Sequence, residues 1–343
     1  MVEPRACAWL DFSVIIATRN RAASLQETLA ALACQETMGR FTYEVVVVDN
    51  GSTDHTRRVV EERSALYPVS LRYLYEGRIG QAWALNAGLG EARGRYLAIT
   101  DDDARPTSMW LSALWRCFLE EGADGVAGRV LPRWTAPRPA WLNDQVARRL
   151  GGLGCVDHGP SRLSSLQGHR CRWTGNNMAI RREVVRRLGP YATHVGQAQD
   201  TEYYLRCVRH GLKVVYEPAA LTFHELDAER MTPERFRWFS HTAGYHNAYF
   251  QPPWKPVHLL TVLPVRWYLE TLRIAAAWML GSLTSRPWGE RFCYELRLRL
   301  RFSLWLHRLQ LWPQWRRSVF GLGGPPPADY FHDVRLIEVE REW

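Results

Sequence analysis

Residues 96–103 read YLAITDDD, an apolar run that passes directly into three consecutive aspartates. A run of this kind predicts a short buried strand. Similar runs occupy residues 12–17 and 43–48, and a weaker one covers residues 71–75. Segments with helical spacing of apolar side chains follow these runs, at residues 24–34, 54–66, 80–92 and about 108–121. The alternation predicts an α/β fold, with a mostly parallel sheet flanked by helices.

The second half of the chain breaks this rhythm. Residues 131–172 are rich in Pro, Gly, Arg and Ser and predict long loops or short helices. Strands are expected near residues 178–180 and 213–216, and helices at 183–188 and 200–210. From residue 252 the sequence becomes rich in Trp, Leu and Arg, which indicates a C-terminal helical appendage. The predicted parts are an α/β domain over residues 1–250, a basic helical region over 251–320 and a tail over 321–343.

The composition favours an anionic partner. The chain has a formal net charge of +9, with 16 Trp and 14 Tyr. Such a balance suits nucleotide phosphates or an acidic lipid surface, and no DNA- or RNA-binding signature is present, so nucleic acid is not expected. Seven dispersed cysteines without a CxxC motif are typical of reduced thiols, and residues 1–11 lack the apolar core of a signal peptide. We therefore expect a cytoplasmic protein.

Polar residues follow the predicted strands where each one ends. In a parallel sheet, ligands gather at the carboxyl ends of the strands. This rule selects four segments, Thr18-Arg19-Asn20, Asp49-Asn50-Gly51, Glu76-Gly77-Arg78 and Asp101-Asp102-Asp103.

The acidic triplet predicts a metal site. Three adjacent carboxylates repel each other, and a divalent cation with oxygen ligands, Mg²⁺ or Mn²⁺, removes that repulsion. The alternative is a solvated turn in which Asp103 caps the next helix. Asp49 is placed to accept a hydrogen bond from a nucleobase, or else to shape a turn. Arg78 can meet phosphate or base, or else be a surface arginine.

Together these segments resemble the family 2 glycosyltransferases, an inverting group with the GT-A fold. The Asp101–Asp103 triplet resembles that family's DXD metal motif, and the segment 199–202 (QDTE) resembles its Glu-Asp catalytic motif. The other matching segments are residues 13–20, 47–54, 80–88, 94–100 and 175–182. Each motif alone is weak, but the ordered set, which spans about residues 12–226, is specific.

The resemblance implies transfer of a sugar from a nucleoside-diphosphate sugar (UDP-, GDP- or dTDP-linked) to a hydroxyl of a carbohydrate or lipid-linked acceptor. Asp200 would remove the acceptor proton. Asp101 and Asp103 would hold Mn²⁺ or Mg²⁺, with His224 as a further ligand, and Trp173 and Glu202 would lie on the acceptor side. The donor-binding residues implied or indicated are Thr18, Arg19, Asn20, Asp49, Asn50, Arg78, Asn86, Asp101, Asp102 and Asn177.

Two departures from the family pattern affect this assignment. Gln199 stands where the family usually has Glu, which lowers the local charge and makes Glu202 a rival base. Ala17-Thr18-Arg19 replaces the usual Pro-Thr or Pro-Val, which alters the base pocket.

Three other readings stay open. A nucleotidyltransferase also uses metal-bound carboxylates, but residues 17–24 contain no Gly for its phosphate loop. A non-catalytic nucleotide-sugar-binding scaffold would have no chemical need for Asp101, Asp103 and Asp200. A zinc site formed by Cys155, His158, His169 and Cys171 would have a spacing unlike common zinc modules.

The helical region is strongly basic. Between residues 255 and 317 there are eleven Lys or Arg against three Glu, a net charge of +8. Residues 259–283 are apolar but interrupted by charges, which argues against a membrane-spanning helix. Basic helices with Trp, Leu and Phe favour an anionic membrane surface at the inner face of the membrane, in surface polysaccharide or glycolipid assembly. The alternative is a helical appendage that packs on the α/β domain or forms a homodimer.

Overall fold

The computed structural model describes residues 10–319 except 151–152, 169–170, 172, 196–197, 251–262 and 264. Contacts divide the chain into two compact units. The α/β unit contains residues 1–133 and 154–225, and the helical unit contains residues 134–153 and 226–343. This division differs from the predicted boundary at residue 250. The α/β unit ends at residue 225, and residues 134–153, which lie between its two segments in the sequence, belong to the helical unit. The predicted tail over 321–343 lies outside the described residues.

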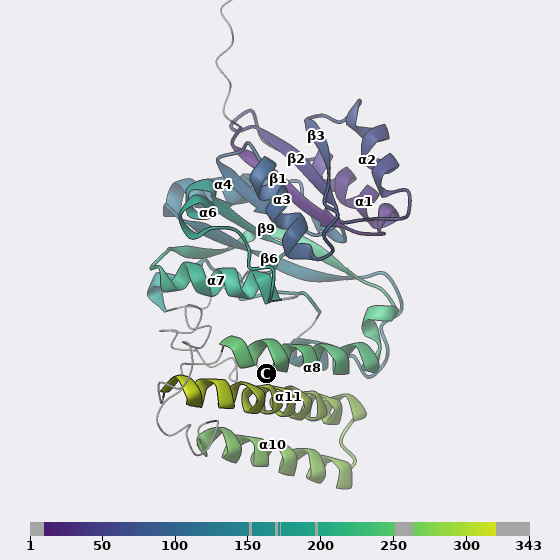
Figure 1. The fold of residues 1–343 in the computed structure, drawn as a ribbon. Coiled ribbons are helices and arrows are strands. Elements are labelled where there is room, and N and C mark those ends of the chain that lie inside the picture. Colours follow the sequence, from purple (N-terminus) through teal and green to yellow (C-terminus); the bar gives the residue numbers. More distant parts are fainter. Residues whose placement is uncertain are drawn as a thin grey trace, which may run out of the picture. The chain divides into compact units, whose positions relative to one another are not determined.

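The α/β unit is built on a sheet with strand order β3-β2-β1-β4-β8-β6-β9-β5 (Figure 1). One half is parallel, as its sequence predicts. It contains β1 (Phe12–Thr18), β2 (Tyr43–Asp49), β3 (Ser70–Tyr75) and β4 (Tyr96–Ile99). The helices of this half are α1 (Ala22–Ala33), α2 (Thr56–Ser64) and α3 (Gln81–Glu91). The registers Thr18↔Asp49 and Ile15↔Ile99 bring the ends of three strands to one edge.

The other half of the sheet is antiparallel, so the sheet is mixed rather than mostly parallel. Strand β8 (Met178–Arg181) runs back along β4, with Tyr96 opposite Arg181. Further strands are β5 (Ala104–Pro106), β6 (Gly125–Trp134), β7 (Leu163–Ser164) and β9 (Val214–Leu226). The helices here are α4 (Trp110–Glu121), η1 (Ser165–Gln167), α6 (Arg182–Leu188) and α7 (Gln199–Arg209).

Alternation along the buried strands creates a core on each face of the sheet. Val45 and Val47 of β2 pack into the cluster that includes α1, α2 and α4, whereas Val46 and Val48 pack into the cluster that includes α3 and α7. Successive strand side chains point to opposite faces, so a strand buried on both sides is mostly apolar. Gly88 lets α3 approach closely, because a Cβ there would lie 2.5 Å from Cγ2 of Ile15.

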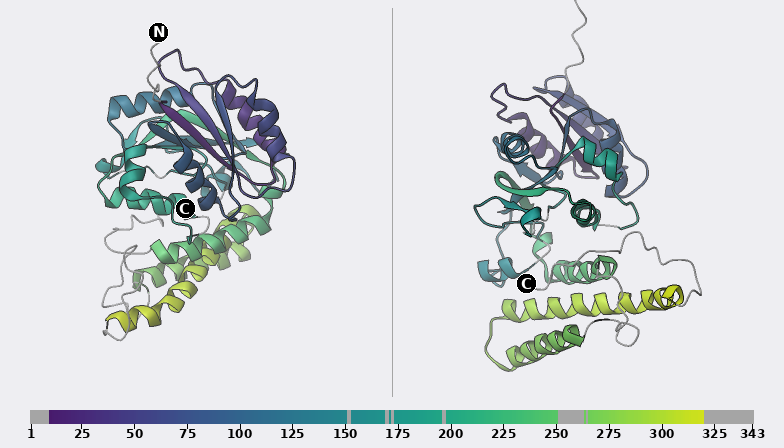
Figure 2. Two further views of the ribbon diagram at one scale, coloured as in Figure 1. Left: turned by 45° about the horizontal axis from the view of Figure 1, so that its top comes forward. Right: turned by 90° about the vertical axis from the view of Figure 1, so that its left-hand side faces the viewer.

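The helical unit stacks three long helices, and α11 lies between α8 and α10 (Figures 1 and 2). Its elements are α5 (Asp144–Arg149), η3 (Glu229–Met231), α8 (Pro233–Phe250), α10 (Val265–Leu283) and α11 (Trp288–Val319). Buried Arg301 joins α11 to α10, donating from Nε to Oγ1 of Thr271 at 2.7 Å and from Nη2 to the carbonyl of Trp267 at 2.6 Å. No described helix is long and apolar enough to cross a bilayer. None of the six described cysteines forms a disulfide.

Candidate active site

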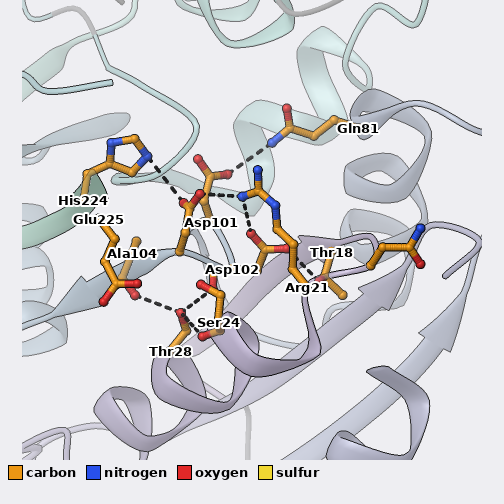
Figure 3. Close-up of polar contacts among 12 residues, drawn as sticks. Thr18, Arg21, Ser24, Thr28, Gln81, Asp101, Asp102, Ala104, His224 and Glu225 are labelled. Carbon is orange, nitrogen blue, oxygen red and sulfur yellow. Dashed lines mark hydrogen bonds and ion pairs between the residues drawn. The ribbon is translucent and has the colours of Figure 1, made fainter. Parts of the chain in front are cut away.

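The acidic triplet lies at the end of β4, beside the start of α1 (Figure 3). Asp102 and Asp103 are 4% and 6% exposed, and Asp101 is partly exposed. The first turns of α1 hold the backbone here, because Oγ of Ser24 donates to the carbonyl of Asp102 at 2.9 Å and Oγ1 of Thr28 donates to it at 2.8 Å. The triplet is therefore an anchored turn with little solvent around two of its carboxylates.

The three carboxylates have different partners. Asp102 accepts from Oγ1 of Thr18 at 2.7 Å and from Nη1 of Arg21 at 3.1 Å. The same Nη1 of Arg21 donates to Oδ2 of Asp103 at 2.5 Å. Oδ1 of Asp103 lies 3.5 Å from Nε2 of His224, and Oδ1 of Asp101 accepts from Nε2 of Gln81 at 3.1 Å. Arg21 thus bridges Asp102 and Asp103, while Asp101 contacts Gln81.

The site is short of positive charge. Burial and the neighbouring carboxylates of Asp103 and Asp102 raise the pKa of Asp101 to about 7. Burial also raises the pKa of Asp102, although Arg21 opposes that shift. Burial lowers the pKa of Arg21, but the carboxylates of Asp102 and Asp103 outweigh it and raise that pKa. The carboxylates of Asp101 and Asp102 are therefore costly to ionise without a further cation, which is the environment that favours a bound divalent ion.

Among the described residues, no group of three or more His, Cys, Asp or Glu side chains forms a ready-made metal site. The predicted set Asp101, Asp103 and His224 is thus not assembled as a three-ligand cage, because Arg21 and Gln81 hold carboxylate oxygens. The donor chemistry still fits an ion that takes one or two carboxylates and completes its shell with phosphate oxygens and water. Of the alternative zinc ligands, the described Cys155, His158 and Cys171 form no such group, and His169 lies outside the described residues.

His224 reaches the triplet from β9. It pairs with Ala104 in the antiparallel register of β5 and β9, and its ring is 6% exposed. Gly154 makes room for it, since a Cβ at that residue would lie 2.8 Å from Cε1 of the ring. Packing and register therefore place a histidine beside Asp103 across a separation that no local pattern reveals.

Gly175 lies between Asp200 and the acidic triplet. Asp200 belongs to the first turn of α7, and its Oδ2 accepts from the backbone N–H of Gly175 at 3.2 Å. A Cβ on Gly175 would lie 3.9 Å from Oδ1 of Asp101. A second link runs through Gln81, which donates to Asp101 and accepts from Nε2 of Gln199 at 2.8 Å. The predicted base and the predicted metal ligand are therefore close neighbours.

The predicted acceptor-side residues are both buried. Glu202 is 3% exposed, and its carboxylate accepts from Nε and Nη2 of Arg206 at 3.0 and 2.5 Å. Trp173 is fully buried and donates from Nε1 to the carbonyl of Asp200 at 2.9 Å. In this arrangement Trp173 supports the backbone of Asp200, and the carboxylate of Glu202 is held along α7.

The residues predicted for the nucleotide lie at the ends of β1 and β2. Asp49 is 2% exposed and accepts from the N–H of Ser52 and from the hydroxyl of Tyr73, each at 2.8 Å. Asn20 has a left-handed backbone (φ 54°) and accepts from the N–H of Thr53 at 2.7 Å. Arg19 is exposed. These contacts join the two strand ends into one polar surface.

Several predicted donor residues bind the protein's own backbone. Asn50 bonds to the backbone of Glu76, Arg78 and Gly80, and Asn86 bonds to both backbone groups of Tyr191. Asn177 is fully buried and bonds to Trp110, Arg129 and Ala220. Arg78 stays largely exposed, lies over the ring of Trp83 at 4.0 Å, and pairs with Glu76 at 2.8 Å.

Two residues of this site were not singled out by the sequence, Arg21 and Gln81. Neither has a local signal that distinguishes it from an ordinary surface residue at the start of a helix. One hint for both is position, because each lies just after a strand-end segment, where side chains of a parallel sheet converge.

Comparison with known proteins identifies a family. The model of the family described as "Glycosyl transferase family 2" matches residues 13–189. The glycosyltransferase AglE of Haloferax volcanii is 27% identical over 212 residues, which cover 62% of this chain and 66% of the relative. The chondroitin synthase of Escherichia coli is 37% identical over 253 residues, which cover 65% of this chain and 36% of the relative. The chain thus spans less than two thirds of either relative.

A similar solved structure is the mannosyltransferase PcManGT from Pyrobaculum calidifontis, in complex with GDP-Man and Mn²⁺. Its TM-score is 0.51 at 22% identity, and the match covers 92% of this chain and 77% of that one. The likeness shows the fold, a mixed α/β sheet flanked by helices.

Proposed function

The chain belongs to glycosyl transferase family 2, and we propose that it transfers a sugar from a nucleoside-diphosphate sugar to an acceptor hydroxyl, with inversion at the anomeric carbon. The observation that carries this proposal is the position of Gly175 between Asp101 and Asp200. An acceptor on the Asp200 side and a diphosphate on the Asp101 side would meet across that glycine. The family match also favours glycosyl transfer over nucleotidyl transfer.

The proposed reaction is a single displacement. The acceptor oxygen attacks the anomeric carbon while the bond from that carbon to the diphosphate oxygen breaks, and the hydroxyl proton passes to the carboxylate of Asp200. Oδ1 of Asp200 accepts from the N–H of Thr201 at 2.6 Å, whereas Oδ2 has the longer bond to Gly175, so Oδ2 is the oxygen we assign to the proton. Attack opposite to the leaving group inverts the configuration.

Asp101 and Asp103 would hold Mn²⁺ or Mg²⁺, with His224 beside Asp103, and the ion would supply Lewis-acid stabilisation of the leaving diphosphate. Asp49 and the segment Thr18-Arg19-Asn20 would bind the nucleoside. The side-chain amides of Asn50, Asn86 and Asn177 bond to backbone groups. We therefore assign these three residues to positioning of the donor site rather than to donor contact.

The test is a binding and hydrolysis screen of the purified chain against UDP-, GDP- and dTDP-sugars with Mn²⁺, Mg²⁺ or EDTA. Metal-dependent thermal stabilisation by one donor, with slow release of its nucleoside diphosphate, is the expected result. No response to any nucleotide with either metal would overturn the proposal.

Metal affinity should depend on pH through Asp101. Its raised pKa means that the folded protein binds more protons than the unfolded chain between about pH 4 and 7, so the free energy of unfolding contributed by this group falls as pH rises through that window. A cation needs the ionised form. Mn²⁺ affinity measured by calorimetry should therefore rise up to about pH 7 and then level off. The matched variant Asp101→Asn should lose this rise, and an equal pH dependence in both proteins would contradict the assignment.

We further propose that the helical unit lies on an anionic membrane surface. One face of α10 is apolar and exposed, with apolar side chains at intervals of three or four residues, namely Val265, Leu269, Leu272, Ala276, Met279, Leu280 and Leu283. Exposed Arg266 and Arg273 flank one edge of this face. Such a stripe with a basic border suits a flat interfacial position on acidic lipids, where a lipid-linked acceptor of polysaccharide or glycolipid assembly would be presented.

A homodimer through the same face is less favourable, because it would bring two strongly basic regions together. The variant Leu272→Glu should weaken binding to vesicles of phosphatidylglycerol and phosphatidylcholine by about tenfold or more, since burial of a leucine contributes about 1.5–3 kcal/mol. Leu119→Glu, at a similarly exposed leucine of α4, is the control and should bind normally. Cosedimentation measures this. If Leu272→Glu binds vesicles normally but no longer forms a dimer, the apolar face of α10 contacts a second copy of the chain and not a membrane.

A further inference from the structure

Arg21 is the cation that the structure places against the acidic triplet (Figure 3). It immediately precedes α1, and its Nη1 bridges Oδ1 of Asp102 at 3.1 Å and Oδ2 of Asp103 at 2.5 Å. The side chain of Arg21 is 46% exposed, whereas those of the two aspartates are 6% and 8% exposed. A guanidinium at the edge of the solvent therefore holds two buried carboxylates through one nitrogen.

The charge balance at this position is incomplete. When all three aspartates are ionised, as a bound cation requires, one arginine leaves two negative charges, which one divalent cation would balance. Oδ2 of Asp103 accepts from Nη1 of Arg21, while Oδ1 lies 3.5 Å from Nε2 of His224. Asp102 has a second anchor in Thr18 and keeps its place without Asp103. A metal that takes Oδ2 of Asp103 displaces one of the two contacts of Arg21 and can leave the other intact.

We propose that Arg21 is a charge-balancing residue that exchanges partners during donor binding. In the metal-free protein it neutralises Asp102 and Asp103. When metal and nucleotide bind, it releases Asp103, stays on Asp102, and turns its outer edge toward the diphosphate. A planar guanidinium suits this task, because its fork of N–H donors matches phosphate oxygens. The inference rests on the proposed function, since it needs a metal and a nucleoside diphosphate at this site.

The exchange predicts two affinity changes of opposite sign in Arg21→Gln. Mn²⁺ alone should bind about three- to tenfold more tightly, because the competing cation beside Asp103 is gone. UDP or GDP at saturating Mn²⁺ should bind about tenfold more weakly, because a charge-assisted contact to phosphate is lost. A purely structural role for Arg21 would weaken both. Isothermal titration calorimetry of the full chain measures each affinity without turnover.

Controls separate the possible outcomes. Arg58→Gln, at an exposed arginine of α2 that pairs with Glu62 at 3.5 Å, should change neither affinity. Arg21→Lys can still bridge the carboxylates with one nitrogen but lacks the fork, so its Mn²⁺ affinity should stay normal and its nucleotide affinity should fall about threefold. If Arg21→Gln does not fold, Arg21→Lys is the variant that tests the proposal.

Wild-type protein that binds neither Mn²⁺ nor a nucleotide would contradict the proposed function. Wild-type binding with both affinities reduced in Arg21→Gln, or neither changed in either variant, would overturn the role of Arg21 alone.

Discussion

Replacing Asp200 by Asn should lower turnover by about 10²- to 10⁴-fold and leave donor binding close to normal, because the amide keeps the shape of the side chain but cannot take the acceptor proton. The bond from Gly175 can still end on the amide oxygen, so the first turn of α7 should keep its position. The measurement is kcat for sugar transfer, together with the affinity for the nucleotide and the melting temperature of the variant.

Glu202→Gln is the matched variant for this prediction. Glu202 is the nearest carboxylate along α7 that could replace Asp200 as base, but its oxygens accept from Arg206 and its side chain is 3% exposed. We expect Glu202→Gln to reduce stability, because the Arg206 pair is weakened, while turnover per folded molecule falls far less than in Asp200→Asn. The reverse ranking of the two variants would move the base to Glu202.

Asp103→Asn should reduce kcat/KM by about 10²- to 10³-fold and weaken Mn²⁺ binding in the presence of nucleotide. An amide is a poorer ligand for a hard cation, and the lost stabilisation of the leaving diphosphate appears directly in the transition state. Part of the activity should return at high Mn²⁺, because the other ligands remain. Steady-state kinetics over a Mn²⁺ series measures both effects.

Asp102→Asn provides the comparison within the triplet. Its carboxylate oxygens accept from Oγ1 of Thr18 and from Nη1 of Arg21. Burial already raises the pKa of Asp102, so a neutral amide fits this position without a large loss of stability. We expect the loss of Mn²⁺ affinity in Asp102→Asn to be at least about tenfold smaller than the loss in Asp103→Asn. Equal losses in the two variants would show that Asp102 is also a ligand.

The sequence alone determined the parallel half of the sheet and the candidate residues at its strand ends. Residues 12–17, 43–48 and 96–100 are mostly apolar because both faces of their strands are buried, and this pattern is recognisable in the sequence without a structure. The polar residues that end these strands follow from the same register, so Asp49 and Asp101 could be assigned to one edge. The family followed from the ordered motifs and is confirmed by the match over residues 13–189.

Only the tertiary structure decided how the second half completes the site. Antiparallel strands β8 and β9 follow loops without a periodic pattern, so their neighbours in the sheet could not be predicted, and only the family resemblance pointed to His224 as a neighbour of Asp103. The assignment of α8 to the helical unit likewise depends on packing against α11, which a boundary drawn from composition cannot detect.

The hydrogen-bond partners of individual polar side chains were also decided by the fold. Asn177 lies in a candidate segment and Arg21 directly follows one, yet Asn177 is buried among backbone carbonyls and Arg21 faces two carboxylates 81 and 82 residues away. A motif records which donors and acceptors are available, but the partner that each one finds depends on which distant segment packs beside it. Hydrogen bonding is directional and short in range, so that choice is made only when the chain has folded.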